Sequence, residues 1–301
     1  MELWIPITIF AAFMQNVRSS LQKYLKGQLS TSGATFARFA YAAPLALLYL
    51  AALVEIGGYD WPGTNTRFFI FSTIGGAGQI IATALLVHIF ALRNFAVGTT
   101  FSKTETIQAA MFGIIVLGES VGFWAIVAIL ISLVGVIMIA VTRVSLNMRD
   151  LLRQCMEPAA LIGIASGGFF GLSAVSYRAA SLALDNGEFF VRAALTLAFA
   201  TVFQTIVMSV YMRVREPGQI TAVFRAWRVA GIVGVVGLLG SIGWVTAMTL
   251  QNAAYVRALG QVELIFTFMV SYFAFREKIT GSEIVGILIV TAGIILLLLN
   301  K

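Results

Sequence analysis

Five long stretches of the chain contain no aspartate, glutamate, lysine or arginine: residues 68–92, 120–142, 158–177, 193–212 and 229–256. A helix needs about 20 apolar residues to cross the hydrocarbon layer of a bilayer. Soluble domains average about 25% charged residues, whereas this chain of 301 residues has 11%, and its mean hydropathy is +0.94. The stretches therefore predict an all-α integral membrane protein that crosses the cell (inner) membrane several times.

Ten transmembrane helices fit the apolar stretches and the turn-rich joints between them. Their predicted bounds are residues 3–24, 33–55, 67–91, 95–117, 121–142, 158–182, 188–211, 229–251, 254–275 and 280–300. The N-terminal segment MELWIPITIF has neither a basic region nor a small-residue cleavage site, so we expect a first membrane helix and not a signal peptide. The joints are short, which leaves no room for a soluble catalytic domain.

The joint at residues 143–157 has two interpretations. In RVSLNMRDLLRQCMEP, apolar residues alternate with Arg143, Arg149 and Arg153, which is typical of a short amphipathic helix on the membrane surface. A plain polar loop fits as well. The net charge of +7 could suggest nucleic acid, but the basic residues cluster in connections beside membrane helices, where anionic lipids favour them. We therefore expect membrane lipids as partners and no nucleic acid.

The sequence repeats itself with an offset of 158 residues. Residues 92–137 then align with residues 250–295 without a gap, and 14 of the 46 aligned positions are identical. Apolar identities arise by chance in such sequences, so the polar matches carry the argument: Glu105 aligns with Glu263, and Glu119 with Glu277. The sequence therefore predicts a first five-helix half at residues 1–142, an interfacial linker at 143–157 and a second five-helix half at 158–301.

An odd number of helices in each half makes the second half enter the membrane from the opposite side. This predicts two inverted repeats, an architecture typical of secondary transporters, whose substrate site lies near mid-membrane between the repeats. Glu105 and Glu263 lie roughly nine to eleven residues into their predicted helices, close to mid-depth at a rise of 1.5 Å per residue. The two glutamates are therefore expected to approach each other in one central chamber.

The doubled pattern resembles the drug/metabolite transporter superfamily, in its ten-helix EamA-type branch. The resemblance is carried by LGE at Glu119, by FRE at Glu277, by the helices of Gly135 and Gly293, and most closely by REKITGSEIVGILIVTAGIILLL. It covers nearly the whole chain and implies a transporter fold. Members of the family export amino acids and other metabolites, or move sugars, nucleotide sugars and cations.

The orientation in the membrane has two opposing indications. The odd-numbered joints carry thirteen lysines and arginines, and the even-numbered joints with the C-terminus carry five. The positive-inside rule then places the odd joints in the cytoplasm and both termini outside. The family resemblance implies that both termini lie inside.

Lys103 and Glu105 are unusual because they interrupt apolar sequence. A charge within the bilayer costs at least about 2.5 kcal/mol, even on the lenient insertion scale. Residues at i and i+2 of a regular helix point away from each other, so each charge needs a partner elsewhere. Lys103 is expected to meet Glu263 or a carboxylate of the substrate. A purely structural clamp between the two helices is the alternative.

Polar stripes on other helices complete the predicted chamber. Gln15, Arg18, Ser19 and Gln22 lie on one face of the first helix, although Arg18 and Gln22 could instead extend to the membrane surface. Similar stripes contain Gln79, Tyr177 and Trp244. The predicted substrate-binding residues are Gln15, Arg18, Ser19, Gln79, Lys103, Glu105, Tyr177, Trp244, Gln261 and Glu263.

Proton coupling is the second predicted role of the chamber. A low-dielectric environment favours the protonated form of a carboxylate, and a neighbouring lysine opposes this. Glu263 has Gln261 where Glu105 has Lys103, so Glu263 is the better candidate, followed by Glu105. His88 could relay protons, or simply bind a neighbouring group. With one histidine and one cysteine, Cys155, we expect no metal site and no cofactor.

Four further groups of polar residues are expected to be structural. Arg38 and Arg192 lie at predicted helix starts and are interpreted as boundary anchors. Asn94 and Asn252 are expected to cap helices or form turns. Glu119 and Glu277 lie in turns and are expected to be solvated.

The favoured function is secondary transport, and more specifically export, of a small polar metabolite by alternating access. Cations and carboxylates in one chamber favour a zwitterion such as an amino acid, which pairs with both signs at once. An organic-cation or drug transporter of the same fold is the alternative. An integral-membrane enzyme or a lipid-handling protein is a third class, but the sequence contains no catalytic motif in a usable context, so we expect no enzyme.

Overall fold

The computed structural model describes residues 2–92, 98, 100–141, 157–273 and 280–300. Its first half contains α1 (Trp4–Leu25), α2 (Thr31–Ala40), α3 (Ala42–Ala51), η1 (Ala52–Ile56), α4 (Thr66–Ile89), η2 (Ser102–Thr104), α6 (Glu105–Phe112), η3 (Gly113–Leu117) and α7 (Phe123–Val141). Its second half contains α9 (Pro158–Leu182), α10 (Phe189–Arg215), α11 (Gln219–Arg225), α12 (Trp227–Leu250), α13 (Ala253–Leu259), η4 (Gly260–Val262), α14 (Glu263–Phe273) and α15 (Gly281–Leu299). Residues 143–156 of the predicted linker, which the sequence left open as a surface helix or a loop, lie outside the described residues, as do Asn94 and Glu277.

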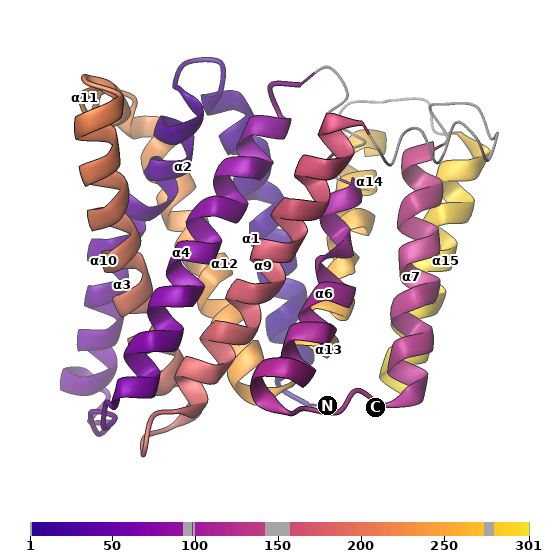
Figure 1. Cartoon of the computed structure of the whole chain (residues 1–301), viewed down its shortest axis with the longest axis horizontal. Coiled ribbons are helices and arrows are strands. Elements are labelled where there is room, and N and C mark those ends of the chain that lie inside the picture. Colours follow the sequence, from indigo (N-terminus) through magenta and orange to yellow (C-terminus); the bar gives the residue numbers. More distant parts are fainter. Residues whose placement is uncertain (1, 93–97, 99, 142–156, 274–279, 301) are drawn as a thin grey trace.

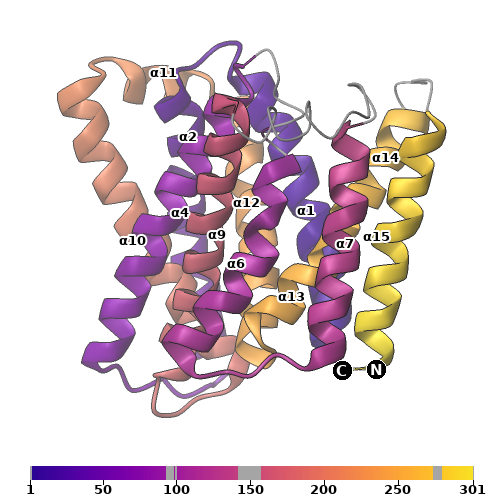
Figure 2. The ribbon, with the colours of Figure 1, turned by 45° about the vertical axis from the view of Figure 1, so that its right-hand side comes forward.

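The long helices run side by side between the two ends of one bundle, and both chain termini lie at the same end (Figure 1). In that view α1 begins at the lower end and α9 begins at the upper end. The leading helices of the two halves therefore run in opposite directions, and the relation of the halves as inverted repeats stays a prediction. α7 and α15 form one edge of the bundle (Figure 2).

Six helices of the described chain are long and apolar enough to cross a membrane: Thr31–Ile56, Thr66–Ile89, Pro158–Leu182, Phe189–Arg215, Trp227–Leu250 and Gly281–Leu299. α1 has 22 residues, but its polar stripe with Gln15 and Arg18 makes it less apolar. The segments that contain Glu105 and Glu263 are divided by 3-10 turns into shorter helices. The fold is thus that of an all-α, multi-pass membrane protein, and ten crossings stay a prediction.

The distribution of polarity is the reverse of that in a soluble protein. Large apolar side chains are exposed on the outside, among them Phe10, Phe13, Ile70, Ile115 and Phe123. Polar side chains are buried inside, among them Gln22, Thr83, Ser166 and Gln204, each with 0% exposure. An apolar surface of this extent requires an apolar surrounding, as expected for a protein in a membrane.

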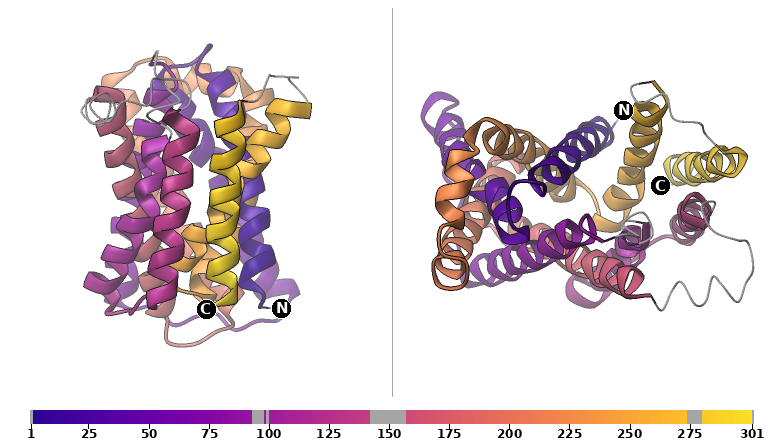
Figure 3. Two further views of the ribbon diagram at one scale, coloured as in Figure 1. Left: turned by 90° about the vertical axis from the view of Figure 1, so that its right-hand side faces the viewer. Right: turned by 90° about the horizontal axis from the view of Figure 1, so that it is seen from above.

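The packing between the two halves is reciprocal. α1 packs along α12 and also contacts η4 and α14, while α9 packs along α4 and contacts η2 and α6. α7 packs along α15, and α2 packs on α10. The contacts of α1 with the second half thus correspond to the contacts of α9 with the first half, which is what two related halves would produce. Seen from above, the helices of both halves surround one central region (Figure 3).

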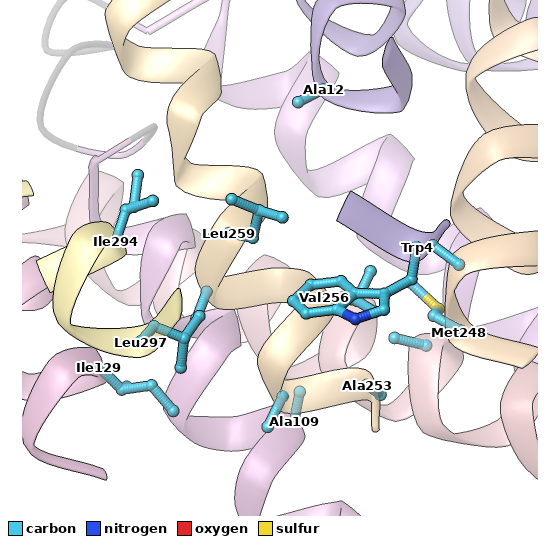
Figure 4. Close-up of a cluster of buried hydrophobic side chains, with 14 of the residues drawn as sticks. Trp4, Ala12, Ala109, Ile129, Met248, Ala253, Val256, Leu259, Ile294 and Leu297 are labelled. Carbon is cyan, nitrogen blue, oxygen red and sulfur yellow. The ribbon is translucent and has the colours of Figure 1, made fainter. Parts of the chain in front are cut away.

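A hydrophobic cluster fixes the short helix α13 within the bundle. Figure 4 shows Trp4 of α1 beside Val256 of α13 and Met248 of α12, with Leu259 and Leu297 on the far side of α13. Trp4 and Met248 are 3% and 1% exposed, and Val256 is fully buried. Asn252 caps α13, since its side-chain oxygen accepts a hydrogen bond from the Ala254 amide at 2.8 Å, which confirms the predicted role. The cluster holds in place the helix that carries Arg257.

Candidate functional site

The two glutamates predicted to share a chamber each begin a helix after a break. The 3-10 turn Ser102–Thr104 precedes Glu105, and the 3-10 turn Gly260–Val262 precedes Glu263. The two breaks are 158 residues apart, the offset of the sequence repeat. A carboxylate at the start of a helix interacts favourably with the helix dipole. The repeat in the sequence therefore corresponds to a repeated local structure, a 3-10 turn followed by a helix that begins with a glutamate.

Lys103 forms its ion pair with the glutamate of the other half. The distance from Lys103 Nζ to Glu263 Oε2 is 2.8 Å, and the two side chains are 16% and 11% exposed. Gln15 Nε2 donates a second hydrogen bond to the same oxygen at 2.8 Å. The predicted meeting of Lys103 and Glu263 is confirmed, and α1 supplies the amide that completes it.

Glu105 has a different cation, also from the other half. Arg257 Nη1 lies 3.5 Å from Glu105 Oε1, and the Arg257 guanidinium lies over the Trp244 ring at 4.6 Å from its centroid. Lys103 and Glu105 thus have separate partners, as their spacing predicted. Gln261 Nε2 adds a third link between the broken helices, donating to Thr106 Oγ1 at 3.1 Å.

A row of glycines on α9 positions the first helix break. A Cβ atom added to Gly167 would lie 2.6 Å from the Ser102 carbonyl oxygen, and one added to Gly171 would lie 2.9 Å from the Ala109 amide nitrogen. Gly163, one turn earlier, would meet the Gly98 carbonyl. The backbone of the broken helix therefore rests directly on α9, as small residues permit in membrane helix packing.

Gly167→Ala is expected to destabilise the protein by about 1–3 kcal/mol, because the new methyl group overlaps the Ser102 carbonyl. The melting temperature in detergent should fall. Gly113→Ala is the matched control, since a Cβ there has no neighbour within 4 Å and alanine favours the helix. Equal melting temperatures for the Gly167 and Gly113 variants would contradict this account of the break.

Two further arginines lie inside the bundle. Arg18 of α1 and Arg38 of α2 are each 3% exposed. Arg38 Nη1 donates to Thr83 Oγ1 at 2.9 Å. The interpretation of Arg38 as a boundary anchor is wrong, because Arg38 lies in the last turn of α2 and its long side chain is buried in the interior. Extension of Arg18 and Gln22 to the surface is also wrong, since Gln22 is fully buried and donates to the Ala34 carbonyl at 3.1 Å.

A small cavity lies among these charges and the aromatic residues. It is lined by Gln15, Arg38, Gln79, Phe170, Tyr177, Leu197, Ser241, Trp244, Val245, Met248 and Arg257. In this conformation it has room for about one water molecule. Gln15, Gln79, Tyr177 and Trp244, from the predicted polar stripes, all line this cavity, and their role in binding a substrate stays a prediction. A larger ligand requires the helices around it to separate.

Hydrogen bonds between neutral side chains form one wall of the cavity. The Tyr177 hydroxyl donates to Gln79 Oε1 at 3.1 Å, and Gln204 Nε2 donates to the same oxygen at 2.9 Å. Gln204 is fully buried in α10 and was not among the predicted residues. Its presence in the uncharged stretch 193–212 was the available signal, because an amide there needs an interior partner.

Three predicted residues have other surroundings. His88 is exposed near the end of α4, away from the cavity lining, so its predicted part in proton relay has no support from the geometry. Ser19 is half-buried and does not line the cavity. Glu119, predicted to be solvated, forms an ion pair with Arg178 at 2.6 Å, and Arg178 also donates to the Met248 and Gln251 carbonyls.

Comparison with known proteins agrees with the predicted resemblance. The model of the EamA-like transporter family matches residues 158–299, which run from the start of α9 to the end of α15. The match supports membership of the drug/metabolite transporter superfamily for this half. A solved structure titled "Crystal structure of protein" has the same fold, with a TM-score of 0.71, 13% sequence identity and coverage of 98% of this chain and 96% of the other. No curated protein matches the chain.

Proposed function

We propose that the protein is a secondary transporter of a small polar metabolite, which moves its substrate by alternating access between two inverted halves. The proposal is carried by one observation: Lys103 and Glu105 of the first half bind Glu263 and Arg257 of the second half, beside a cavity in the bundle interior. Charges at this depth cost free energy and usually mark a transport pathway. The EamA-like match of residues 158–299 supports the same class.

The location of these contacts fits the mechanism. They join the two halves at the helix breaks, and discontinuous helices form the substrate sites of many transporters. A transporter that alternates between two states has to rearrange contacts between its halves. During this rearrangement, a charged side chain could release its partner in the other half and bind a charged group of the substrate. No buried charge would then be left without a partner.

A membrane exporter in the cell (inner) membrane is the form of this function that we favour. The zwitterion prediction is weakened by the contacts, because both carboxylates near the cavity already face a cation. An organic-cation transporter is disfavoured by four buried or mostly buried cations, Arg18, Arg38, Lys103 and Arg257, near the cavity. A structural clamp remains the rival explanation for the Lys103–Glu263 pair.

The test is reconstitution of the purified full chain into liposomes. A thermal-shift screen against metabolites selects compounds that stabilise the protein, and counterflow of each radiolabelled compound then measures transport. Protein-dependent counterflow that saturates with substrate is the expected result. Binding without counterflow for every selected compound would contradict a transporter.

Proton coupling through the glutamates belongs to the same proposal, but the original reason for preferring Glu263 is wrong. Gln261 does replace Lys103 in the sequence of the second half, yet Lys103 itself crosses over to Glu263. In the described part of the chain, each glutamate therefore has one cation within 4.0 Å. The two pairs still differ in the distance between the cation nitrogen and the carboxylate oxygen. It is 2.8 Å from Lys103 Nζ to Glu263 Oε2 and 3.5 Å from Arg257 Nη1 to Glu105 Oε1.

Glu263→Gln is expected to abolish transport driven by a pH gradient and to leave exchange of substrate for substrate intact. The amide can still accept a hydrogen bond from Lys103, but it has no proton to exchange. The two fluxes are measured in the same liposomes with and without an imposed pH gradient. Unchanged gradient-driven transport in the variant would rule out Glu263 as the proton carrier.

A further inference from the structure

Two buried arginines near the cavity, Arg18 and Arg38, have no carboxylate partner within 4.0 Å among the residues that the structure describes. Arg18 makes no side-chain hydrogen bond and no ion pair with any residue that the structure describes, although it is only 3% exposed. Arg38, also 3% exposed, has the neutral Thr83 hydroxyl as its hydrogen-bond acceptor. Burying a guanidinium without an anion lowers the stability of the folded protein. The positions of these two side chains therefore suggest that they have a role other than stabilising the fold.

The carboxylates nearby are already bound. Glu263 Oε2 accepts from both Lys103 and Gln15 at 2.8 Å, and Glu105 faces Arg257. Among the described residues, four cations (Arg18, Arg38, Lys103 and Arg257) therefore lie near two carboxylates. Arg18 and Arg38 are the two cations with no carboxylate oxygen within 4.0 Å in the described part of the chain.

The fold brings these two arginines together. Both stems pack over Gly237 of α12, where an added Cβ atom would lie 3.4 Å from Arg38 Cγ and 3.5 Å from Arg18 Cδ. Two like charges placed side by side repel each other, so this arrangement is unfavourable unless an anion lies between or beside them. Arg38 also lines the cavity, together with the Gln15 and Gln79 amides.

We propose that the substrate is a small organic dianion, such as a dicarboxylate, whose oxyanion groups bind Arg18 and Arg38. Arginine presents several N–H donors in a plane that matches a carboxylate or phosphate. This inference rests on the proposed transport function and specifies its substrate. The cavity holds about one water molecule, so the dianion enters in a conformation in which the helices have separated.

The direct test uses four probes of equal chain length and different charge. Succinate, 4-aminobutanoate, putrescine and 1,4-butanediol are added to the purified full chain at matched ionic strength, and thermal unfolding is measured. Succinate is expected to raise the melting temperature, and 4-aminobutanoate less so. Putrescine and butanediol should have no effect. No shift with succinate, or an equal or larger shift with 4-aminobutanoate or putrescine, would overturn the dianion.

Arginine variants separate a binding role from a structural one. Arg18→Gln and Arg38→Gln are each expected to weaken succinate binding about tenfold or more, since each removes charged hydrogen bonds. Without ligand, Arg18→Gln should melt at the same temperature as the parent or higher, because an unpaired buried charge is removed. The exposed Arg67 supplies the control variant Arg67→Gln, which should retain succinate binding. A lower melting temperature of ligand-free Arg18→Gln, with succinate binding unchanged, would overturn the proposal.

Counterflow distinguishes failure of this inference from failure of the transport function. Liposomes that carry the protein are expected to exchange radiolabelled succinate. Exchange of 4-aminobutanoate or putrescine without succinate would refute the dianion and leave the transporter. Binding of succinate that depends on Arg18, without exchange of any probe, would uphold the dianion site and contradict the transporter.

Discussion

Replacing Lys103 with methionine is expected to destabilise the protein by about 3–5 kcal/mol and to abolish transport. Breaking one side of a buried ion pair leaves the other charge without a partner, which costs about this much. Glu263 would keep the Gln15 amide at 2.8 Å but would lose its only cation within 4 Å among the described residues. The apolar surroundings of the bundle add to the penalty. The melting temperature and counterflow of the purified variant measure the two effects.

The double variant Lys103→Met with Glu263→Gln separates stability from transport. Removing both charges leaves no unpaired ion, so most of the lost stability should return. Counterflow should stay absent if Lys103 is part of the mechanism, because the lysine that would exchange its carboxylate partner for the substrate is still missing. If the double variant recovers both stability and transport, the pair is a structural clamp between the halves.

Much of the site could be predicted because polar residues are rare in these helices. Gln15, Gln79 and Tyr177 each interrupt an apolar surface, and an amide or hydroxyl in the membrane interior needs a partner. The helical period then places such residues on one face. The same reasoning paired Lys103 with Glu263, since few opposite charges lie at that depth.

The arginines show where this reasoning stops. Arg38 and Arg257 lie in the last turns of α2 and α13, and an arginine near a helix end commonly extends to the membrane surface. Their long side chains instead point inward, Arg38 to Thr83 and Arg257 over Trp244. The direction of a flexible side chain depends on which neighbouring helix is close, and that depends on the tertiary packing.

The helix breaks were also beyond sequence reasoning. Neither Ser102–Thr104 nor Gly260–Val262 contains proline, and the surrounding residues fit a regular helix. The first break is stabilised by close contact with the glycines of α9. At the second, a Cβ atom on Gly260 would lie 2.5 Å from the Trp244 ring. Both breaks therefore depend on contacts with distant helices.

Each end of the bundle is tied between the halves by hydrogen bonds. At one end, Ser30 and Ser32 donate to Glu216 at 2.5 and 2.7 Å. At the other, the Gly63 amide donates to Asn186 Oδ1 at 2.6 Å, and the Asp185 amide donates to the Gly63 carbonyl at 3.3 Å. Alternating access requires that these ties break in turn, so a covalent link at one end should stop the cycle.

A disulfide between Gly63→Cys and Asp185→Cys is expected to reduce transport to the background level. A Cβ atom at Gly63 would lie 3.6 Å from the Asp185 Cβ, within the usual range of about 3.5–4.5 Å for a disulfide. Cys155 is the only native cysteine, and Cys155→Ser removes the competing thiol. Counterflow is measured after oxidation and again after reduction, with the disulfide content determined by thiol labelling.

Reduction should restore transport, because the thiols no longer hold the two halves together. The two single-cysteine variants serve as controls, since oxidation within one molecule cannot link them and their transport should not respond to it. Full transport in a completely cross-linked sample would mean that this end of the bundle stays closed throughout the cycle. In that case, the ion pairs at the helix breaks could become accessible only from the opposite end of the bundle. The proposed mechanism of alternating access between the two halves would then be wrong.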